Sequence, residues 1–259
     1  MARRLIDLSI TLESDLPSDP KLTIPHIEYR DHEIGGKEML EFFPGLTREQ
    51  LPKGMGWAVE FIQLTTHSGT HLDAPYHFHP QQDHGAPSMT IDQIPLEWCF
   101  SDGVLLDFSH KADGERITAA DVEAKLSRIG YSLKPLDIVL VRTGAEKAWG
   151  TPEYLVTGAG MTRESTLYLL DRGVKVVGID AWTWDRPLPL IAKEFAQTGD
   201  PKIIWEAHFT GIEKGYCHME KMANLGAIPK PYGFQVACFP IKIKSASAGW
   251  VRPVAIVEE

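Results

Sequence analysis

Three of the ten histidines in the chain lie within the segment HSGTHLDAPYHF, residues 67–78. Its candidate functional side chains are His67, His71, Asp73 and His77. Gly69 and Pro75 disfavour a helix here, so we expect extended backbone and turns. In extended backbone His71 and Asp73 point the same way, and a bend at Gly69 lets His67 join them. Two imidazoles and one carboxylate presented together are typical of a zinc or manganese site.

The fourth side chain, His77, need not bind the metal. An imidazole has an unperturbed pKa of about 6.5, which suits a general acid–base next to a metal-bound water. We therefore expect His77 to transfer protons. His79 and His84 follow in a polar segment and are expected to be solvated.

The motif HSGTHLDAP, with a histidine two positions later, resembles the signature of the metal-dependent cyclase-like hydrolases, which include bacterial kynurenine formamidases and isatin hydrolases. The resemblance runs from LIDLS near the N-terminus to the last strands. It implies that His67, His71 and Asp73 bind the metal and that His77 acts in catalysis. It also implies a metal-site histidine and, twelve residues later, a Glu or Gln in a helix of the C-terminal third. Those positions hold His208 and Glu220.

The resemblance further implies a swivelling β/β/α domain, zinc or manganese as cofactor, a small-molecule substrate, and a homodimer or homotetramer. Glu220 stands where isatin hydrolases have Gln. A carboxylate favours two ions and an amide favours one, so the metal count stays open. Residues 29–56 and 181–207 look like additions relative to kynurenine formamidases. The tryptophan of their early loop has no counterpart in LESDLPSDP.

Aromatic residues supply candidate walls for a substrate pocket. Trp182 and Trp184 follow an apolar stretch, and ligands of α/β sheets bind beyond the carboxyl ends of strands. Because the two alternate, one can stack on a planar substrate while the other covers the core. Trp57 and Phe61, just upstream of the histidine cluster, are further candidates.

Two charged residues next to these tryptophans have two interpretations each. Asp180 either orients a ligand histidine or caps the following turn. Arg186 either holds a substrate carboxylate or makes a surface ion pair.

The surrounding elements indicate a single α/β domain, residues 1–259, with a mixed sheet and flanking helices. Two helix-then-strand units indicate crossover connections and parallel pairing. Their helices, 118–130 and 162–173, have Thr118 and Thr162 as caps and Gly130 and Gly173 as ends, and their strands are 137–144 and 174–180. Further strands are expected at 4–12, 57–67 and 103–108, and antiparallel ones within 232–245 and 249–258. The charged, Gly-rich segment 29–56 is expected to lie outside the core. Too few helix–strand units are visible for a TIM barrel, and the pattern is not that of a jelly roll.

Composition excludes several classes of function. The net charge of −9 argues against nucleic-acid and anionic-membrane partners. No stretch approaches the roughly 18 apolar residues of a membrane span, and the N-terminal residues lack a signal-peptide core. The three cysteines have no CxxC spacing, so we expect no disulfide framework and a cytoplasmic location.

Together these features predict a metal-dependent hydrolase of a small amide, cyclic amide or imide, aryl formamide or lactone. Two alternatives remain. The pattern HxD…H of His71, Asp73 and His208 also occurs in non-haem Fe(II) oxygenases, although such a triad uses neither His67 nor His77. The other alternative is a non-catalytic relative that only binds a metal or ligand.

Overall fold

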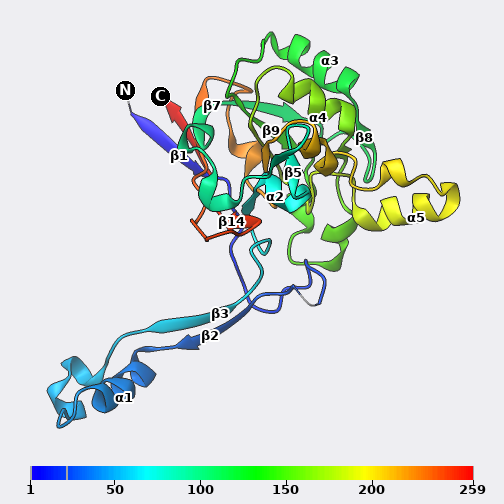
Figure 1. Cartoon of the computed structure of the whole chain (residues 1–259). Coiled ribbons are helices and arrows are strands. Elements are labelled where there is room, and N and C mark those ends of the chain that lie inside the picture. Colours follow the sequence, from blue (N-terminus) through cyan, green and yellow to red (C-terminus); the bar gives the residue numbers. More distant parts are fainter. Residues whose placement is uncertain (1, 22, 259) are drawn as a thin grey trace.

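The computed structural model describes residues 2–21 and 23–258, so residues 1, 22 and 259 of the predicted domain lie outside the described residues. A nine-stranded mixed sheet forms its centre (Figure 1). In spatial order its strands are β1 (Arg3–Asp7), β15 (Val254–Glu258), β13 (Phe234–Ala237), β7 (Phe100–Asp107), β9 (Ile138–Arg142), β11 (Val176–Ile179), β12 (Cys217–Glu220), β4 (His71–Asp73) and β14 (Ala248–Trp250). Strands β7, β9, β11 and β12 pair in parallel, and antiparallel pairs flank them. The expected mixed α/β fold is confirmed.

Strand β9 illustrates why the centre of the sheet is apolar on both faces. Val139 and Val141 belong to one apolar cluster, and Ile138 and Leu140 belong to the other. Successive side chains of a strand point to opposite faces, so both faces of β9 are covered. A strand buried in this way reads as a continuous apolar run.

The two predicted crossover helices are present. In α3 (Ala119–Ile129) the Thr118 side chain accepts the Asp121 N–H, and Gly130 ends the helix in the left-handed conformation. In α4 (Arg163–Leu170) Thr162 is the cap, and the turn that directly follows the helix ends at Gly173, which is left-handed and whose N–H donates to the Leu170 carbonyl, as expected. Both helices pack in the apolar cluster that contains Val139 and Val141.

Residues 26–63 form an arm that projects from the body (Figure 1). Strands β2 (His26–Arg30) and β3 (Val59–Gln63) pair with each other, and α1 (His32–Phe42) lies at the tip. A Cβ on Gly35 would lie 1.8 Å from the Trp57 carbonyl oxygen, so the close approach of α1 to the returning chain requires glycine there. Segment 29–56 is therefore outside the core, as expected. The strand predicted at 57–67 covers only 59–63 and pairs within the arm, not with the central sheet.

The remaining elements complete the chain. They are α2 (Pro75–Phe78), α5 (Leu188–Thr198), β5 (Gln81–Gln82), β6 (Ala86–Pro87), β8 (Arg116–Ile117), β10 (Gly160–Met161) and several 3-10 turns, among them η8 (His208–Ile212). The two predicted C-terminal stretches give antiparallel strands, as expected, but the ordered strands are shorter. Within the described part of the chain, every helix is too short or too polar to cross a bilayer.

Candidate metal centre

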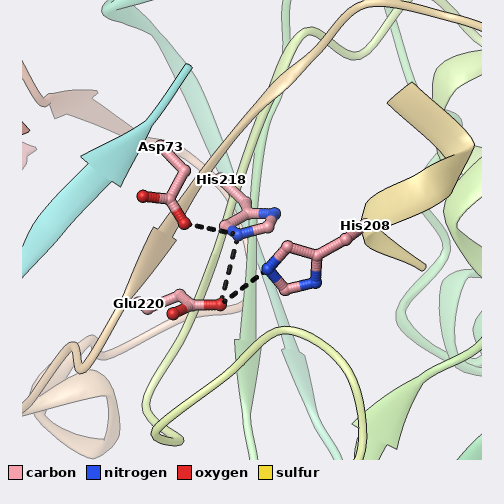
Figure 2. A group of neighbouring side chains, drawn as sticks. All are labelled: Asp73, His208, His218 and Glu220. Carbon is pink, nitrogen blue, oxygen red and sulfur yellow. Dashed lines mark hydrogen bonds and ion pairs between the residues drawn. The ribbon is translucent and has the colours of Figure 1, made fainter. Parts of the chain in front are cut away.

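Two neighbouring strands present the central side chains of the site. In the antiparallel pair of β4 and β12, His218 lies opposite Asp73 and Glu220 lies opposite His71. Since side chains alternate along a strand, all four point to the same face. The intervening Leu72 and Met219 point into the apolar cluster on the other face. Figure 2 shows Asp73, His218 and Glu220 converging with His208.

The distances show that the predicted site residues lie close together. Nε2 of His71 lies 3.3 Å from Oδ1 of Asp73 and 3.7 Å from Oε2 of Glu220. Nδ1 of His67 lies 2.9 Å from the same Asp73 oxygen, and the chain between the two histidines bends at Gly69, whose φ is 66°. His208 brings Nε2 to 3.5 Å from Oε1 of Glu220. Residues from 67–73 and from 208–220 thus form one cluster.

Two buried atoms in this cluster make no aligned hydrogen bond among the described residues. They are Nε2 of His71 and Oδ1 of Asp73, which face each other; Nδ1 of His67 lies close to this oxygen but is not aligned to donate to it. An unpaired buried polar atom costs about 1–3 kcal/mol, and an ion between the two would remove that cost. Imidazole nitrogens and carboxylate oxygens are the donors that zinc and manganese accept, so the residues fit a divalent metal.

The donors form two groups that share one residue. Asp73, His208, His218 and Glu220 make one group, and His67, Asp73 and His77 make the other. A carboxylate has two oxygens, so Asp73 can serve both groups at once. This arrangement has room for either one ion or two.

Mutual interactions keep the carboxylates charged. Burial acts to raise the pKa of Asp73, but the neighbouring imidazoles of His77, His71 and His67 and a hydrogen bond from His218 hold it well below its usual range. For Glu220, burial is likewise outweighed by His218, and its pKa falls to about 2.

His218 was not predicted. Burial opposes its charge, but its hydrogen bonds to Asp73 and Glu220 raise its pKa to about 9. Its Nε2 lies 2.9 Å from Oδ2 of Asp73 and 3.2 Å from Oε1 of Glu220. The sequence held a signal for it, because His218 stands two residues before Glu220 and a strand puts both on one face.

The expected helix around His208 and Glu220 is wrong. His208 begins the 3-10 turn η8, and Glu220 ends strand β12. Nδ1 of His208 is hydrogen-bonded to Oδ2 of Asp185, which also accepts the His208 backbone N–H. This bond directs Nε2 towards Glu220. Asp185 therefore has the orienting position that was considered for Asp180.

The Asp180 carboxylate instead accepts bonds from the backbone N–H groups of Thr143 and Gly144 and from the Thr143 hydroxyl. It fixes the loop after β9 and does not touch a ligand histidine. Arg186 is buried and pairs with Glu194 at 2.8 Å, so it neither lines the pocket nor makes a surface pair.

His77 lies in α2 at the edge of the cluster. Its Nε2 is 3.9 Å from Oδ2 of Asp73, and its ring lies against that of His67 with centroids 4.1 Å apart. Burial lowers the pKa of His77 to about 4. The imidazole is therefore neutral at pH 7 and can accept a proton.

A cavity of about 270 Å³ adjoins the cluster. His67, His77, His208 and Glu220 line one part of it, and the aromatic rings of Trp182 and Trp205 line another. Trp205, which was not predicted, stacks on His208 at 4.3 Å between centroids. The other histidines of the 67–84 region take no part: His84 is exposed and His79 is half-buried. The three cysteines are free and buried, and no disulfide joins them.

Three of the four predicted wall residues do not line this cavity. Trp184 is fully buried, and its backbone N–H donates to Oε1 of Glu220 at 2.8 Å. This bond holds the Glu220 carboxylate in place, and the buried indole ring cannot touch a substrate. Trp57 and Phe61 lie on the arm, where they are 37% and 54% exposed. Trp182 alone stands where it was expected.

Comparison with known proteins places the chain in the family that the sequence motif indicates. The Cyclase family model matches residues 6–186, more than half of the chain. The isatin hydrolase of Roseibium aggregatum is 26% identical over 79% of this chain and 76% of its own length. The kynurenine formamidase of Salinibacter ruber is 25% identical over 74% of this chain and 77% of its own length.

Solved structures agree on the fold. The crystal structure of an isatin hydrolase bound to the product analogue thioisatinate superposes with a TM-score of 0.77, at 18% identity, over 99% of this chain and 93% of that one. The chain belongs to the Cyclase family, as a low-identity relative of isatin hydrolase and kynurenine formamidase.

Proposed function

We propose that the protein is a metal-dependent hydrolase that cleaves a small amide, a cyclic amide or imide, an aryl formamide or a lactone. The observation that carries this proposal is the pair of unpaired buried atoms, Nε2 of His71 and Oδ1 of Asp73, next to the neutral imidazole of His77. The names of the two curated relatives also describe hydrolysis.

The metal-binding residues of this proposal are those the sequence predicts, with His218 added: His67, His71, Asp73, His208, His218 and Glu220. Zinc or manganese bound there would act as a Lewis acid and lower the pKa of water from about 16 towards 7. Asp185 and the Trp184 backbone N–H hold His208 and Glu220 in place.

His77 is the proposed general acid–base. Its neutral ring accepts the proton of the attacking water and returns it to the leaving nitrogen or oxygen. Trp182 and Trp205 stack on a flat substrate and exclude bulk water from the carbonyl. No other titratable group is needed for this proton transfer.

The experiment that tests the proposal compares metal content and hydrolysis in wild type and His71→Ala. We expect bound zinc or manganese and turnover of isatin or an aryl formamide in wild type, and loss of both in the variant. Iron dependence with oxygen consumption would support the oxygenase instead. Bound metal without turnover of any amide, imide or lactone would support the non-catalytic relative.

We also propose that the chain acts as one domain, in a homodimer or homotetramer, in the cytoplasm. A two-stranded hairpin is marginally stable alone, and the arm exposes large apolar side chains on both strands and on α1. A symmetric contact in which each copy lends its arm to another would cover them. Because Trp57 and Phe61 do not reach their own pocket, any role in substrate binding requires the pocket of another copy.

Three free, buried thiols are compatible with a reducing compartment.

A further inference from the structure

A buried ammonium group lies in the wall of the cavity, next to the metal centre. Lys221 follows Glu220 directly, and its side chain is only 4% exposed. Its Nζ donates to Oδ1 of Asp19 and, at 2.9 Å, to the backbone carbonyl of His67. Both Lys221 and Asp19 line the cavity, and neither has a part in the hydrolysis described above.

The ammonium group has one donor left. It carries three N–H bonds, and two of them are directed at Asp19 and His67. Among the residues that the structure describes, no other acceptor lies within hydrogen-bonding distance of Nζ, whereas the cavity does adjoin this side chain. A bound molecule is therefore the available acceptor for the third N–H.

The backbone of Lys221 adds an independent observation. Its φ of 56° places it in the left-handed region, which costs a side-chain-bearing residue about 1–2 kcal/mol. The conformation is held by two bonds, from the Lys221 N–H to the Ala181 carbonyl and from the Thr70 hydroxyl to the Lys221 carbonyl. Strain of this kind gathers at functional sites. Here it aims the ammonium along the cavity wall.

Asp19 fixes the charge of this subsite. Its Oδ1 also accepts the indole N–H of Trp182 at 2.7 Å, so the carboxylate is tied to the aromatic wall. The ring of Trp182 lies 5.4 Å from Nζ. Because Asp19 already neutralises Lys221, the pair offers a strong donor with no net positive charge. An uncharged carbonyl oxygen suits such a donor better than a second anion, which would repel Asp19.

We propose that Lys221 is a substrate-binding residue whose third N–H donates to an uncharged carbonyl oxygen next to the carbonyl that is hydrolysed. The inference rests on the proposed function and narrows its substrate class. The ligand is a flat ring that stacks on Trp182 and carries two carbonyl groups, as in a cyclic dicarbonyl amide or an imide. Substrates with a single carbonyl lack the contact.

The test is a comparison of binding by two probes that differ in one oxygen. Isatin has a ketone beside its lactam carbonyl, and 2-oxindole lacks only that ketone. Calorimetric titrations use the metal-loaded full chain carrying His77→Ala, so that turnover does not interfere, and the absorbance of isatin reports any hydrolysis. Binding is measured whether or not the protein is a hydrolase, so failure of the proposed function is seen separately.

In this background we expect Lys221→Met to weaken isatin binding by about ten- to hundredfold, the value of a charge-assisted hydrogen bond, and 2-oxindole binding by less than about threefold. Since Lys221→Met leaves Asp19 buried without a partner, the double variant Asp19→Asn/Lys221→Met is measured beside it. The double variant removes the charge pair as a unit and keeps the Trp182 acceptor. Its affinity for isatin should fall as in Lys221→Met, with little change in its affinity for 2-oxindole.

Lys175→Met is the matched control. Lys175 also donates to a backbone carbonyl, that of Gly215, and lies near a tryptophan ring, but it does not line the cavity. It should leave the binding of both probes unchanged. Equal losses for the two probes in both Lys221 variants, no loss for either, or no binding of isatin by the parent protein would overturn the proposal.

Discussion

His71 and Glu220 face each other across the antiparallel pair of β4 and β12, with Nε2 of the histidine 3.7 Å from Oε2 of the glutamate. The register of two short strands therefore decides whether the histidine motif and the C-terminal carboxylate share one site. The other oxygen of Glu220 lies near His208 and His218, so one carboxylate reaches both sides of the cluster.

Replacement of this carboxylate tests the number of ions. Asp73 belongs to both donor groups, and Glu220 reaches His208 and His218 with one oxygen and His71 with the other. We therefore expect two equivalents of metal in wild type and one in Glu220→Gln. The amide keeps the shape but loses the second anionic oxygen. Plasma mass spectrometry of the purified proteins measures the change. Glu213→Gln is the control, because it removes a carboxylate that pairs with Arg163 away from the site. It should keep the wild-type metal content. An unchanged content in Glu220→Gln would contradict the binuclear centre.

Removal of the His77 imidazole should separate metal binding from turnover. We expect His77→Ala to keep its metal and to lose about 10²–10⁴-fold in kcat, the usual contribution of a general acid–base. Steady-state kinetics with metal analysis on the same samples checks both. His79→Ala, two residues along and outside the cavity, should retain activity. If His77→Ala turned over at the wild-type rate with its metal in place, another group would have to move the proton.

Asp185 should act on the metal through His208. In Asp185→Asn the acceptor for the Nδ1 proton is weakened, so the ring loses its fixed orientation, and we expect metal affinity to fall by about 10–100-fold. Competition with a chromogenic chelator measures this affinity. Asp200→Asn, at an exposed 3-10 cap, provides the control. Equal affinities in Asp185→Asn and wild type would show that η8 alone orients His208.

Asp180 gives a prediction about pH. Burial raises its pKa in the folded protein to about 6, from the ordinary value of 3.8. The folded state therefore binds the proton more tightly, so this contribution to stability is complete below pH 3.8 and is lost as the pH rises through 6. Relative to Asp180→Asn, the unfolding free energy of wild type should therefore fall by about 2 kcal/mol between pH 4 and pH 7.

Urea unfolding at both pH values measures that difference. Effects of pH on the metal centre are common to both proteins and cancel in the comparison. A difference that grows with pH, or does not change, would mean that the three donors to Asp180 outweigh its burial.

The arm should control assembly. Phe42 of α1 is 70% exposed and packs edge-on against Phe43 and Trp57. We expect Phe42→Glu to shift the protein from dimer or tetramer towards monomer with little loss of monomer stability, because a surface substitution typically costs within about 0.5 kcal/mol. Light scattering after size exclusion measures the mass. Glu41→Gln, its neighbour, should not change it. A wild-type protein that is already monomeric would refute the assembly.

The parts of the site that could be predicted from the sequence are those in which residues close in the chain share a face of an extended backbone. His71 and Asp73 lie two residues apart, and Gly69 supplies the bend, so their convergence follows from local geometry. The helix expected at Glu220 came from the family resemblance, and the four buried residues of the strand that is present give no reliable period to correct it. His218 was lost with that error.

Other features depend on partners far away in the chain. Asp185 orients His208 across 23 residues, and Asp19 meets Lys221 across 202, so no local pattern marks either contact. The predicted strand at 57–67 has an apolar pattern that fits a sheet, but such a pattern does not determine which strand it pairs with. Its pairing with β2 placed Trp57 and Phe61 on the arm.

The alternation along β4 and β12 also bears on how the chain reaches its native state. If β12 slipped by one residue against β4, His218 and Glu220 would point into the apolar cluster and Met219 would face the candidate metal site. That arrangement would lose most of the metal-binding side chains. An ion bound by both strands would therefore favour the native pairing of two segments almost 150 residues apart, and folding without metal would lack this selection.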